Sequence, residues 1–491
     1  MTLDPRTPVL VGVGQIKQRP DDLSQALEAI ALMEAAVVAA GVDSGAPELL
    51  AKASAIGVVD GAWGYSDPAR ILADNIGATD AITLLSATGG NTPQSYVNAL
   101  ATRIRSGELD VAIVTGGETI WSRRKKRAAG LPRDLTEQVG VEPDERFQTE
   151  VQMATPFEAA RGFEMPVQLY PTFESAFRHA RGETIGEHRD RVSALWSTFN
   201  QVAVENPYAW IRTPMSAEQI RESTDDNRMV GFPYTKAMNS NWNLDQAAAL
   251  ILCSAEAAEA AGVPRDRWVF PYAGTDAHDT YTVSERRDLH SSPAINEAGR
   301  VLFEMTGLGP DDLAHIDIYS CFPSAVQISA TELGIGLDRQ LTVTGGLTFA
   351  GGPLNNYVTH SIATMASTLR DDPGTLGLVT ANGGFLTKHA LGIYSTEPPS
   401  SPFEARNVQA AVDTIPVTPI DEGFVGEARI EGYTVMHSGT GPERALAAVR
   451  TASGARSWAN STDSQVMTEL MTVEGVGRPV EVDPDGVFHL G

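Results

Sequence analysis

A pair of glycines, Gly89 and Gly90, separates an apolar run from a predicted helix. The run Ala81–Ser86 predicts a buried strand. Asn91 or Thr92 can cap the helix that follows. A strand that leads to the exposed N–H groups of a helix N-terminus is a place where anions often bind and where chemistry often occurs. The turn is therefore the first candidate for a functional site.

A run of basic residues, RRKKR at 123–127, is a second candidate. It includes Arg123 and Arg124, and it stands out in a chain whose formal net charge is −25. One interpretation is a solvated surface run, and the other is a patch that binds the phosphate groups of a ligand. The sequence leaves both interpretations open.

A third polar cluster contains Asp276, His278 and Asp279, with His290 further along the chain. Carboxylate and imidazole groups can bind metals, but a metal site requires three or more ligands that converge in space. The spacing gives no sign of such convergence. We therefore predict no metal site.

The glycine turn lies within an alternation of strands and helices that extends over residues 1–120. Apolar runs and helical periodicity predict strand Thr7–Ile16, helix Leu23–Ala40 stopped at Gly41, strand Ala53–Val59, helix Pro68–Ile76 and, after the helix that begins near Thr92, strand Val111–Val114 closed by Gly116 and Gly117. Such alternation is typical of a layered α/β sheet.

The alternation restarts at Ile295. The predicted elements are helix Ile295–Thr306, strand His315–Tyr319, helices Ser324–Leu333 and Thr359–Leu369, and strands Gly377–Thr380 and Leu391–Ser395. A second α/β series is what a duplicated core leaves in a sequence. After a proline-rich linker at 397–402, we expect a small β-barrel or sandwich, of which an OB-like barrel is one form. Its predicted strands are Gly423–Met436, Arg444–Ala452 and Val466–Val473.

Residues 81–118 resemble the nucleophile segment of the thiolase superfamily, in which a catalytic cysteine precedes the helix and the next strand ends in a glycine-rich turn containing glutamate. Here that turn is Gly116-Gly117-Glu118, and counting back from it places the cysteine position on Gly90. A segment NPY at 206–208, after a long helix, resembles the loop domain of sterol-carrier-type thiolases. With an extra C-terminal domain, the whole resembles the thiolase-like protein type 1 group.

The resemblance covers roughly residues 7–396. It implies an α/β thiolase fold, with two similar βαβαβαββ halves in αβαβα layers. The implied domains are an N-terminal half (1–118 and 246–267), a loop domain (119–245), a C-terminal half (268–396) and an extra β-rich domain (397–491). Thiolases usually dimerise beside the strand that corresponds to residues 81–86. Whether this chain forms a homodimer or a monomer stays open.

Three further loops complete a thiolase active site, and the resemblance places each of them. Tyr319 stands where thiolases carry an asparagine or a histidine; its hydroxyl could donate a hydrogen bond or move a proton, and packing in the core is the alternative. The tract Gly345–Leu354 places the catalytic histidine position on Gly352. Ala381 fills the acid/base position of the last loop. Cysteine and histidine are thus missing together, and glycine supplies neither thiolate nor imidazole.

Backbone N–H groups in these loops could line a slot for a thioester. The predicted ligand-binding residues are Gly89, Gly90, Asn91, Gly351, Gly352, Asn382, Gly383 and Gly384, together with Arg123 and Arg124. Cys321 is expected to be a buried structural thiol, because free cysteine is often simply part of a core. Lys388 and His389 lie just downstream of the last loop and could reach the cleft, while exposure at the surface is the more usual alternative.

Composition limits the class of protein. With 491 residues, of which 42% are hydrophobic, the chain is expected to form two or three globular domains. The acidic balance argues against nucleic acid as a partner, and the two cysteines allow no disulfide framework. The beginning of the chain has no signal-peptide pattern, and no apolar run approaches the ~20 residues of a membrane helix. These features predict a cytoplasmic protein without membrane insertion.

The resemblance implies a protein of lipid metabolism in a family of nominal acetyl-CoA acyltransferases. Coenzyme A or acyl-CoA would be its ligand, with no covalently bound cofactor. Ordinary thiolase activity is not expected, because covalent catalysis requires the thiolate. The alternative is an enzyme that acts on carbon–carbon bonds without a covalent intermediate, such as a retro-aldolase for β-hydroxyacyl-CoA with Tyr319 as acid/base.

Overall fold

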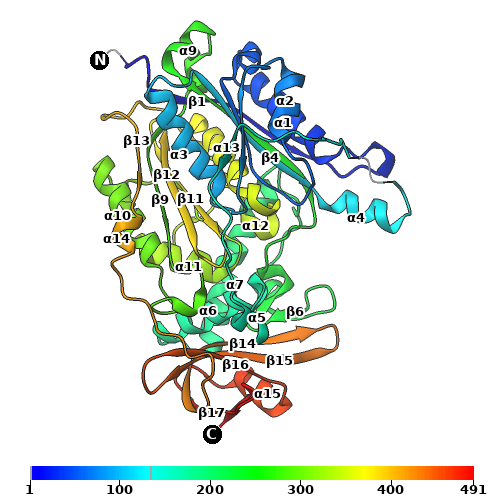
Figure 1. The fold of residues 1–491 in the computed structure, drawn as a ribbon, viewed down its shortest axis with the longest axis vertical. Helices are drawn as coiled ribbons and strands as arrows, with labels where there is room; N and C mark the ends of the chain where they lie inside the picture. The colour runs from blue at the N-terminus through cyan, green and yellow to red at the C-terminus, as the bar shows by residue number, and fades with distance from the viewer. Residues whose placement is uncertain (1–2, 133–134) are drawn as a thin grey trace.

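Two β-sheets with helices on their faces make up most of the chain, of which the computed structural model describes residues 3–132 and 135–491. Residues 1 and 2 of the predicted N-terminal half, and residues 133 and 134 of the predicted loop domain, lie outside these ranges. In Figure 1 the two sheets lie in the upper part of the molecule and the C-terminal strands at its lower end.

The first sheet has the strand order β1-β8-β4-β2-β3-β5. Its strands are β1 (Pro8–Lys17), β2 (Ala55–Val58), β3 (Ile82–Ser86), β4 (Val111–Thr119), β5 (Glu145–Phe147) and β8 (Asp245–Ser254). Every residue of β4 and β8 is buried. Such continuous apolar strands are typical of a sheet that helices cover on both faces.

The second sheet has the order β10-β11-β12-β9-β13. Its strands are β9 (Phe270–His278), β10 (His315–Asp317), β11 (Leu376–Gly383), β12 (Lys388–Ser395) and β13 (Glu404–Asn407). The antiparallel pair β11 and β12 places Lys388 opposite Gly383.

The two sheets repeat one pairing pattern. Strands β1, β8, β4 and β2 pair in that order as antiparallel, antiparallel and parallel neighbours. Strands β9, β12, β11 and β10 pair in the same order and with the same senses. The repeat confirms the prediction of two similar halves.

Helices separate and cover the sheets. Between the sheets lie α3 (Thr92–Arg105) and α13 (Tyr357–Asp371), each of which contacts strands of both. The first sheet carries α1 (Ala29–Asp43) and α2 (Pro68–Ile76) on its outer face, and the second carries α10 (Pro293–Thr306), which packs on α11 (Pro323–Glu332). This is the predicted αβαβα layering.

The central position of α3 explains why its polar side chains are buried. Ser95 and Asn98 both donate hydrogen bonds to the Asp276 carboxylate on β9, with an Asn98 Nδ2 to Asp276 Oδ2 distance of 2.7 Å. Tyr394 of β12 donates to Gln94 at 2.8 Å. Buried polar groups must be paired, and these pairs fix the helix against the second sheet.

A helical segment connects the halves and supports the C-terminal strands. It contains α4 (Ile120–Ala128), α5 (Pro156–Ala160), α6 (Pro166–Ala180), α7 (Ile185–Glu205), α8 (Ala217–Arg221), β6 (Met229–Gly231) and β7 (Tyr234–Thr235). A capping box, in which the Thr184 hydroxyl and the Glu187 carboxylate each accept a backbone N–H of the other residue, begins α7. The remaining short helices are α9 (Ala255–Ala260), α12 (Gly346–Phe349) and α14 (Gln409–Val412).

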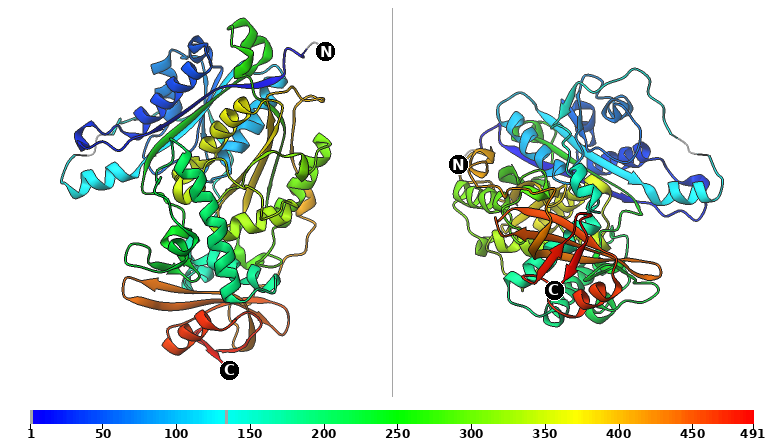
Figure 2. Two further views of the ribbon diagram at one scale, coloured as in Figure 1. Left: turned by 180° about the vertical axis from the view of Figure 1, so that it is seen from behind. Right: turned by 60° about the horizontal axis from the view of Figure 1, so that its bottom comes forward.

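The C-terminal strands form a sheet of order β16-β15-β14-β17-β18, to which β6 also pairs. They are β14 (Gly426–Ser438), β15 (Gly441–Thr451), β16 (Arg456–Ser461), β17 (Pro479–Val482) and β18 (Phe488–Leu490), with α15 (Ser464–Thr472) between β16 and β17. A parallel bridge between Asn460 and Val487 brings the two ends of the sheet together. Figure 2 shows these strands against the helical segment from two further sides.

Several predicted elements differ from the structure, and packing explains the differences described next. The predicted helix Leu23–Ala40 is a short 3-10 turn, Leu23–Gln25, followed by α1, which continues past Gly41. Gly41 does not end the helix, because its missing side chain makes room for Leu50: a Cβ there would lie 2.7 Å from Leu50 Cδ1.

The strand predicted to close at Gly116 and Gly117 instead continues as β4 to Thr119, since both glycines pair with alanines of β8. The predicted strand Val466–Val473 lies in helix α15. Asp463 caps this helix by accepting from the backbone N–H of Gln465 at 2.7 Å, and Val466, Met467 and Leu470 form its buried face.

Among the described residues, no helix is both long enough and apolar enough to cross a bilayer.

Candidate functional site

The turn before α3 is held in place by its own backbone and by β5. The Thr92 hydroxyl donates to the Gly89 carbonyl at 2.7 Å, and the Ala87 N–H donates to the Phe147 carbonyl of the edge strand at 2.8 Å. Asn91 donates from Nδ2 to Gln148 Oε1 at 3.3 Å. The Asn91 Oδ1 atom is buried and has no hydrogen-bond partner among the described residues.

Gly90 faces two oxygen atoms from the second half. A Cβ added at Gly90 would collide with the Tyr319 hydroxyl and would lie 2.5 Å from the Asn382 carbonyl oxygen. Tyr319 is buried, and its ring packs edge-to-face on Tyr357 with 5.6 Å between centroids. Both interpretations of Tyr319 therefore describe it in part: the ring belongs to the core, and the hydroxyl faces the glycine turn.

Burial sets the protonation of the groups beside this turn. Desolvation raises the pKa of Tyr319 far above its ordinary value, so the hydroxyl remains a hydrogen-bond donor at neutral pH. Burial also raises the pKa of Cys321 to about 12. Its Sγ lies 3.7 Å from Asn382 Nδ2. As expected from the sequence, Cys321 is a buried thiol, and at neutral pH it carries its proton.

The hairpin of β11 and β12 brings Asn382 and Gly383 to the same place. A Cβ at Gly383 would lie 2.5 Å from Asn91 Oδ1 and 3.2 Å from the Gly90 nitrogen. Asn382 donates from Nδ2 to the Tyr170 hydroxyl at 2.9 Å, and its Oδ1 has no partner among the described residues. Since side chains alternate along a strand, Ala381 points to the opposite face of β11.

The structure separates the remaining glycines from this turn. Gly351 has φ +117° and faces Gln246 and Leu244, while a Cβ at Gly352 would lie 2.5 Å from Ser240 Oγ. Gly384 faces the Met153 sulfur, at 2.8 Å from an added Cβ. The predicted site therefore divides: Gly89, Gly90, Asn91, Tyr319, Asn382 and Gly383 lie together, whereas Gly351, Gly352 and Gly384 are surrounded by other side chains.

Lys388 and His389 are buried, so of the two alternatives exposure at the surface is wrong. Both belong to β12, whose two faces are covered. The Lys388 ammonium donates to the Thr88 carbonyl and would lie 2.7 Å from a Cβ at Gly89. Burial lowers the pKa of Lys388, and the Glu150 carboxylate opposes that effect. The predicted strand began at Leu391 and not at Lys388, so the prediction left Lys388 outside the hairpin that reaches the glycine turn.

His360 on α13 is a buried residue that the sequence analysis did not single out. It lines a cavity of about 10 Å³ together with Gly351, Gln246 and Tyr357. Its Nδ1 is 2.9 Å from Gln15 Oε1, and its Nε2 has no partner among the described residues. Burial lowers the pKa of His360 to about 3, which keeps the imidazole neutral. The cavity has room for about one water molecule.

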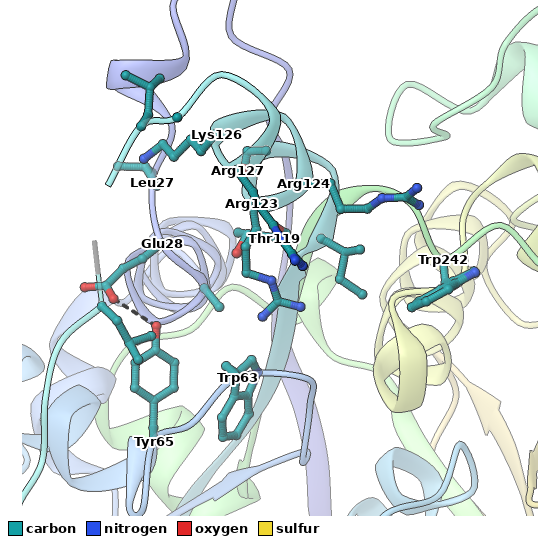
Figure 3. Close-up of a pocket in the computed structure, with 16 residues that line it drawn as sticks. Leu27, Glu28, Trp63, Tyr65, Thr119, Arg123, Arg124, Lys126, Arg127 and Trp242 are labelled. Atoms are coloured by element: carbon teal, nitrogen blue, oxygen red, sulfur yellow. Dashed lines mark hydrogen bonds between the residues drawn. The ribbon is translucent and has the colours of Figure 1, made fainter. Parts of the chain in front are cut away.

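Arg123 and Arg124 lie elsewhere, on α4, where they line a cavity of about 730 Å³ with residues of four other segments (Figure 3). The helix that carries them projects from the first half of the molecule (Figure 1). No residue of the glycine turn lines this cavity.

The third polar cluster does not converge. Asp276 accepts from α3, while Asp279 accepts from Ser292 and lies 3.4 Å from His389 Nε2. Within residues 3–132 and 135–491, no group of three or more histidine, cysteine or acidic side chains is placed to hold a metal ion.

The groups that reach the glycine turn are a phenol, an amide, an ammonium and backbone N–H and C=O groups. Such groups can hold a carbonyl or an oxyanion by hydrogen bonds. Tyr319 as a donor and Lys388 as a cation are the strongest of them, because charged and desolvated donors form the shorter bonds.

Comparison with known proteins gives consistent results. Residues 407–487 match the family model described as the thiolase-like protein type 1 additional C-terminal domain. The fold is similar over the whole of both chains to a monomeric SCP2-thiolase-like protein type 1 from Mycobacterium smegmatis, with 31% identity and a TM-score of 0.86.

More distant similarity extends to thiolases and an aldolase. An acetyl-CoA acetyltransferase of Methanothermobacter thermautotrophicus is 26% identical over 299 residues, which cover 56% of this chain and 73% of that one. The Ltp2-ChsH2(DUF35) aldolase shares the fold over 80% of this chain and 99% of its own, with 18% identity and a TM-score of 0.60.

Proposed function

The chain belongs to the thiolase-like protein type 1 family, and from this premise we propose that it binds coenzyme A thioesters at the Gly89–Asn91 turn without thiolase chemistry. The thioester carbonyl would lie among the Tyr319 hydroxyl, the Lys388 ammonium and the backbone N–H groups of the turn. The protein would thus be an acyl-CoA-binding member of lipid metabolism.

The observation that carries this proposal is the occupied space at Gly90. The Tyr319 hydroxyl and the Asn382 carbonyl oxygen lie where a nucleophilic side chain would begin. At the position corresponding to the catalytic histidine, Ser240 Oγ lies 2.5 Å from a Cβ added to Gly352. Neither position has room for a thiol or an imidazole unless its neighbours move. Both observations therefore support a site without covalent catalysis.

Two polar atoms support binding at this turn. Asn91 Oδ1 and Asn382 Oδ1 are buried acceptors without a partner among the described residues. A buried polar atom of this kind is unfavourable unless something pairs with it. The amide N–H groups of a pantetheine arm are donors that could satisfy both.

The test measures binding and turnover in the same preparations. Acetyl-CoA should bind saturably in calorimetry, and Asn382→Asp, which places a charge beside the thioester, should weaken binding at least tenfold. Gly423→Ala, at an exposed glycine with open space around it, is the control and should bind like the wild type. Cleavage of acetoacetyl-CoA by free CoA at ordinary thiolase rates would refute the proposal, as would equal binding by the wild type and Asn382→Asp.

A retro-aldolase is the second candidate, and the position of the Tyr319 hydroxyl beside the glycine turn favours it. In that reaction a base takes the proton of the β-hydroxyl, the bond between the α and β carbons breaks, and the α carbon receives a proton. Incubation with a branched β-hydroxyacyl-CoA should then release a carbonyl compound and a shorter acyl-CoA. Product formation that Tyr319→Phe abolishes would favour the enzyme over the binding protein.

A further inference from the structure

A cavity lined by basic side chains lies beside α4, and no residue of the Gly89–Asn91 turn lines it. It has a volume of about 730 Å³, within the range usual for small-molecule sites. Four basic residues of α4 line it, namely Arg123, Arg124, Lys126 and Arg127, while Lys125 on the same helix does not. Concentration of positive charge in one cavity of a chain with net charge −25 points to an anionic ligand.

The guanidinium groups are available to such a ligand. Within the part of the chain that the structure describes, Arg123, Arg124 and Arg127 form no salt bridge with any acidic side chain. Arg123 donates to the Ala62 carbonyl, and Arg124 is 3.5 Å from Asn243 Oδ1. Guanidinium groups bind phosphate in a bidentate way, and they are preferred where that geometry matters.

The acidic group in the cavity wall is already engaged. The carboxylate of Glu28 accepts from the Tyr65 hydroxyl at 3.0 Å and from the Thr136 N–H at 2.8 Å. The Glu118 carboxylate, behind the wall, accepts from the Ala62 N–H at 2.6 Å, and its burial raises its pKa to about 7. Neither carboxylate neutralises Arg124 or Arg127.

Aromatic rings form another part of the wall. Trp63 and Tyr65 lie with 5.1 Å between ring centroids, and Trp63 donates from its indole N–H to the Gly117 carbonyl at 3.1 Å, which fixes the ring. Trp242 is 53% exposed at another edge of the cavity. Figure 3 shows the α4 side chains on one side, with Trp63 and Tyr65 opposite and Trp242 further away. Indole faces are surfaces on which nucleic-acid bases stack.

We propose that this cavity binds an adenosine diphosphate group, with Arg124 and Arg127 on the phosphates and Trp63 against the base. The group has two sources, a free nucleotide or the nucleotide end of coenzyme A. The site is separate from the glycine turn, so the proposal does not depend on the function proposed above. It corresponds to the phosphate-binding interpretation of the basic run.

Calorimetric titration with ADP tests the proposal. ADP should bind with one site per chain, and the double variant Arg124→Gln/Arg127→Gln should weaken it by about a hundredfold, because each charge-assisted contact is worth about tenfold. Lys125→Gln is the matched control: it removes one positive charge from the same helix, but its ammonium lies 4.9 Å from the Trp121 ring centroid and not in the cavity. Its affinity should stay within twofold of the wild type.

Further titrations identify which parts of the ligand are bound and which molecule supplies it. Trp63→Leu should weaken ADP about tenfold while leaving pyrophosphate unchanged. If coenzyme A is the source, CoA competes with ADP and loses the same factor in the double variant; if a free nucleotide is the source, CoA does not compete. Binding of acetyl-pantetheine, which lacks the nucleotide, should be the same in the wild type and the double variant.

Three results would overturn the proposal. They are the absence of saturable ADP binding, equal weakening by Lys125→Gln and by the double variant, and pyrophosphate binding as tight as ADP. Since Arg124 and Arg127 are exposed, unchanged thermal unfolding of the double variant separates lost binding from lost folding.

Discussion

Replacing Gly90 by alanine tests the central geometric statement about the glycine turn. The added methyl group would collide with the Tyr319 hydroxyl and lie 2.5 Å from the Asn382 carbonyl oxygen. Overpacking of a well-packed site destabilises a protein by about 1–3 kcal/mol. Alanine also restricts the unfolded chain, which offsets about 0.4–1 kcal/mol. We therefore expect Gly90→Ala to lower the free energy of unfolding by about 1–2 kcal/mol.

A double-mutant cycle with Tyr319→Phe assigns the effect to the hydroxyl. Phenylalanine keeps the ring but removes the oxygen that meets the new methyl group. Gly90→Ala should therefore be less destabilising in the Tyr319→Phe background than in the wild type, with a coupling of about 1 kcal/mol. Urea unfolding followed by tryptophan fluorescence measures all four proteins under one set of conditions.

Gly423→Ala is the control, because its Cβ would meet nothing within 4 Å. Its stability should stay within about 0.5 kcal/mol of the wild type. A Gly90→Ala protein as stable as Gly423→Ala would refute the reasoning. Strictly additive effects of Gly90→Ala and Tyr319→Phe would refute the role of the hydroxyl. A Gly90→Cys protein that cleaves acetoacetyl-CoA would show that the neighbours move aside readily.

Other features give shorter tests. Cys253 and Cys321 are buried, and burial raises the pKa of each thiol to about 12, so mass spectrometry after iodoacetamide treatment at pH 8 should find both unmodified in the native protein and both alkylated in urea. Burial raises the pKa of Glu118 from 4.5 to about 7, so between these pH values the carboxyl group is protonated in the folded state and ionised in the unfolded state. The free energy of unfolding should therefore fall as the pH rises from about 4.5 to 7. Glu118→Gln should reduce this fall by up to about 3 kcal/mol. Arg456 is fully buried and pairs with Glu431 at 2.7 Å while donating to the Ser284 carbonyl at 2.7 Å; Arg456→Met breaks this buried pair and should lower the free energy of unfolding by about 3–5 kcal/mol, measured by urea unfolding. Strand β5 pairs with β3 and covers its edge, so sedimentation should find a monomer, and a stable dimer would contradict that reasoning.

Hydrophobic periodicity predicted the alternation of strands and helices, and the resemblance to thiolases supplied the αβαβα layering. The apolar runs of β4, β8 and β12 and the stripe of α3 mark buried elements, and their order along the chain gives two successive α/β series. Glycine caused two of the boundary errors. Gly41 lies inside α1 and Gly116 inside β4, where a missing side chain admits Leu50 and Asn356. From the sequence alone, a glycine that ends a helix or strand cannot be distinguished from one that makes room for a neighbouring side chain, because that side chain comes from a distant segment.

The site was predicted in part, for a similar reason. Asn382 and Gly383 reach the Gly89–Gly90 turn because the hairpin ends there, and the resemblance to thiolases indicated that meeting. Exposure at the surface was the more usual alternative for Lys388 because lysine usually is exposed, whereas the register of β12 on β11 places it opposite Gly383. Arg123 and Arg124 were grouped with the thioester loops on charge alone. Charge predicts the type of ligand but not the position of its site.

The expected coupling between Gly90 and Tyr319 is the physical basis for our proposal that Gly90 stands in place of a nucleophile. A glycine alone would leave a cavity where a side chain had been, and cavities destabilise a core. Here the space is occupied by a tyrosine hydroxyl, and at Gly352 by Ser240. Each of these groups comes from a different segment from the glycine that it faces, so on the proposed function a substitution that adds a side chain at Gly90 also requires the removal of the Tyr319 hydroxyl. The double variant Gly90→Cys/Tyr319→Asn should therefore have a higher free energy of unfolding than Gly90→Cys alone.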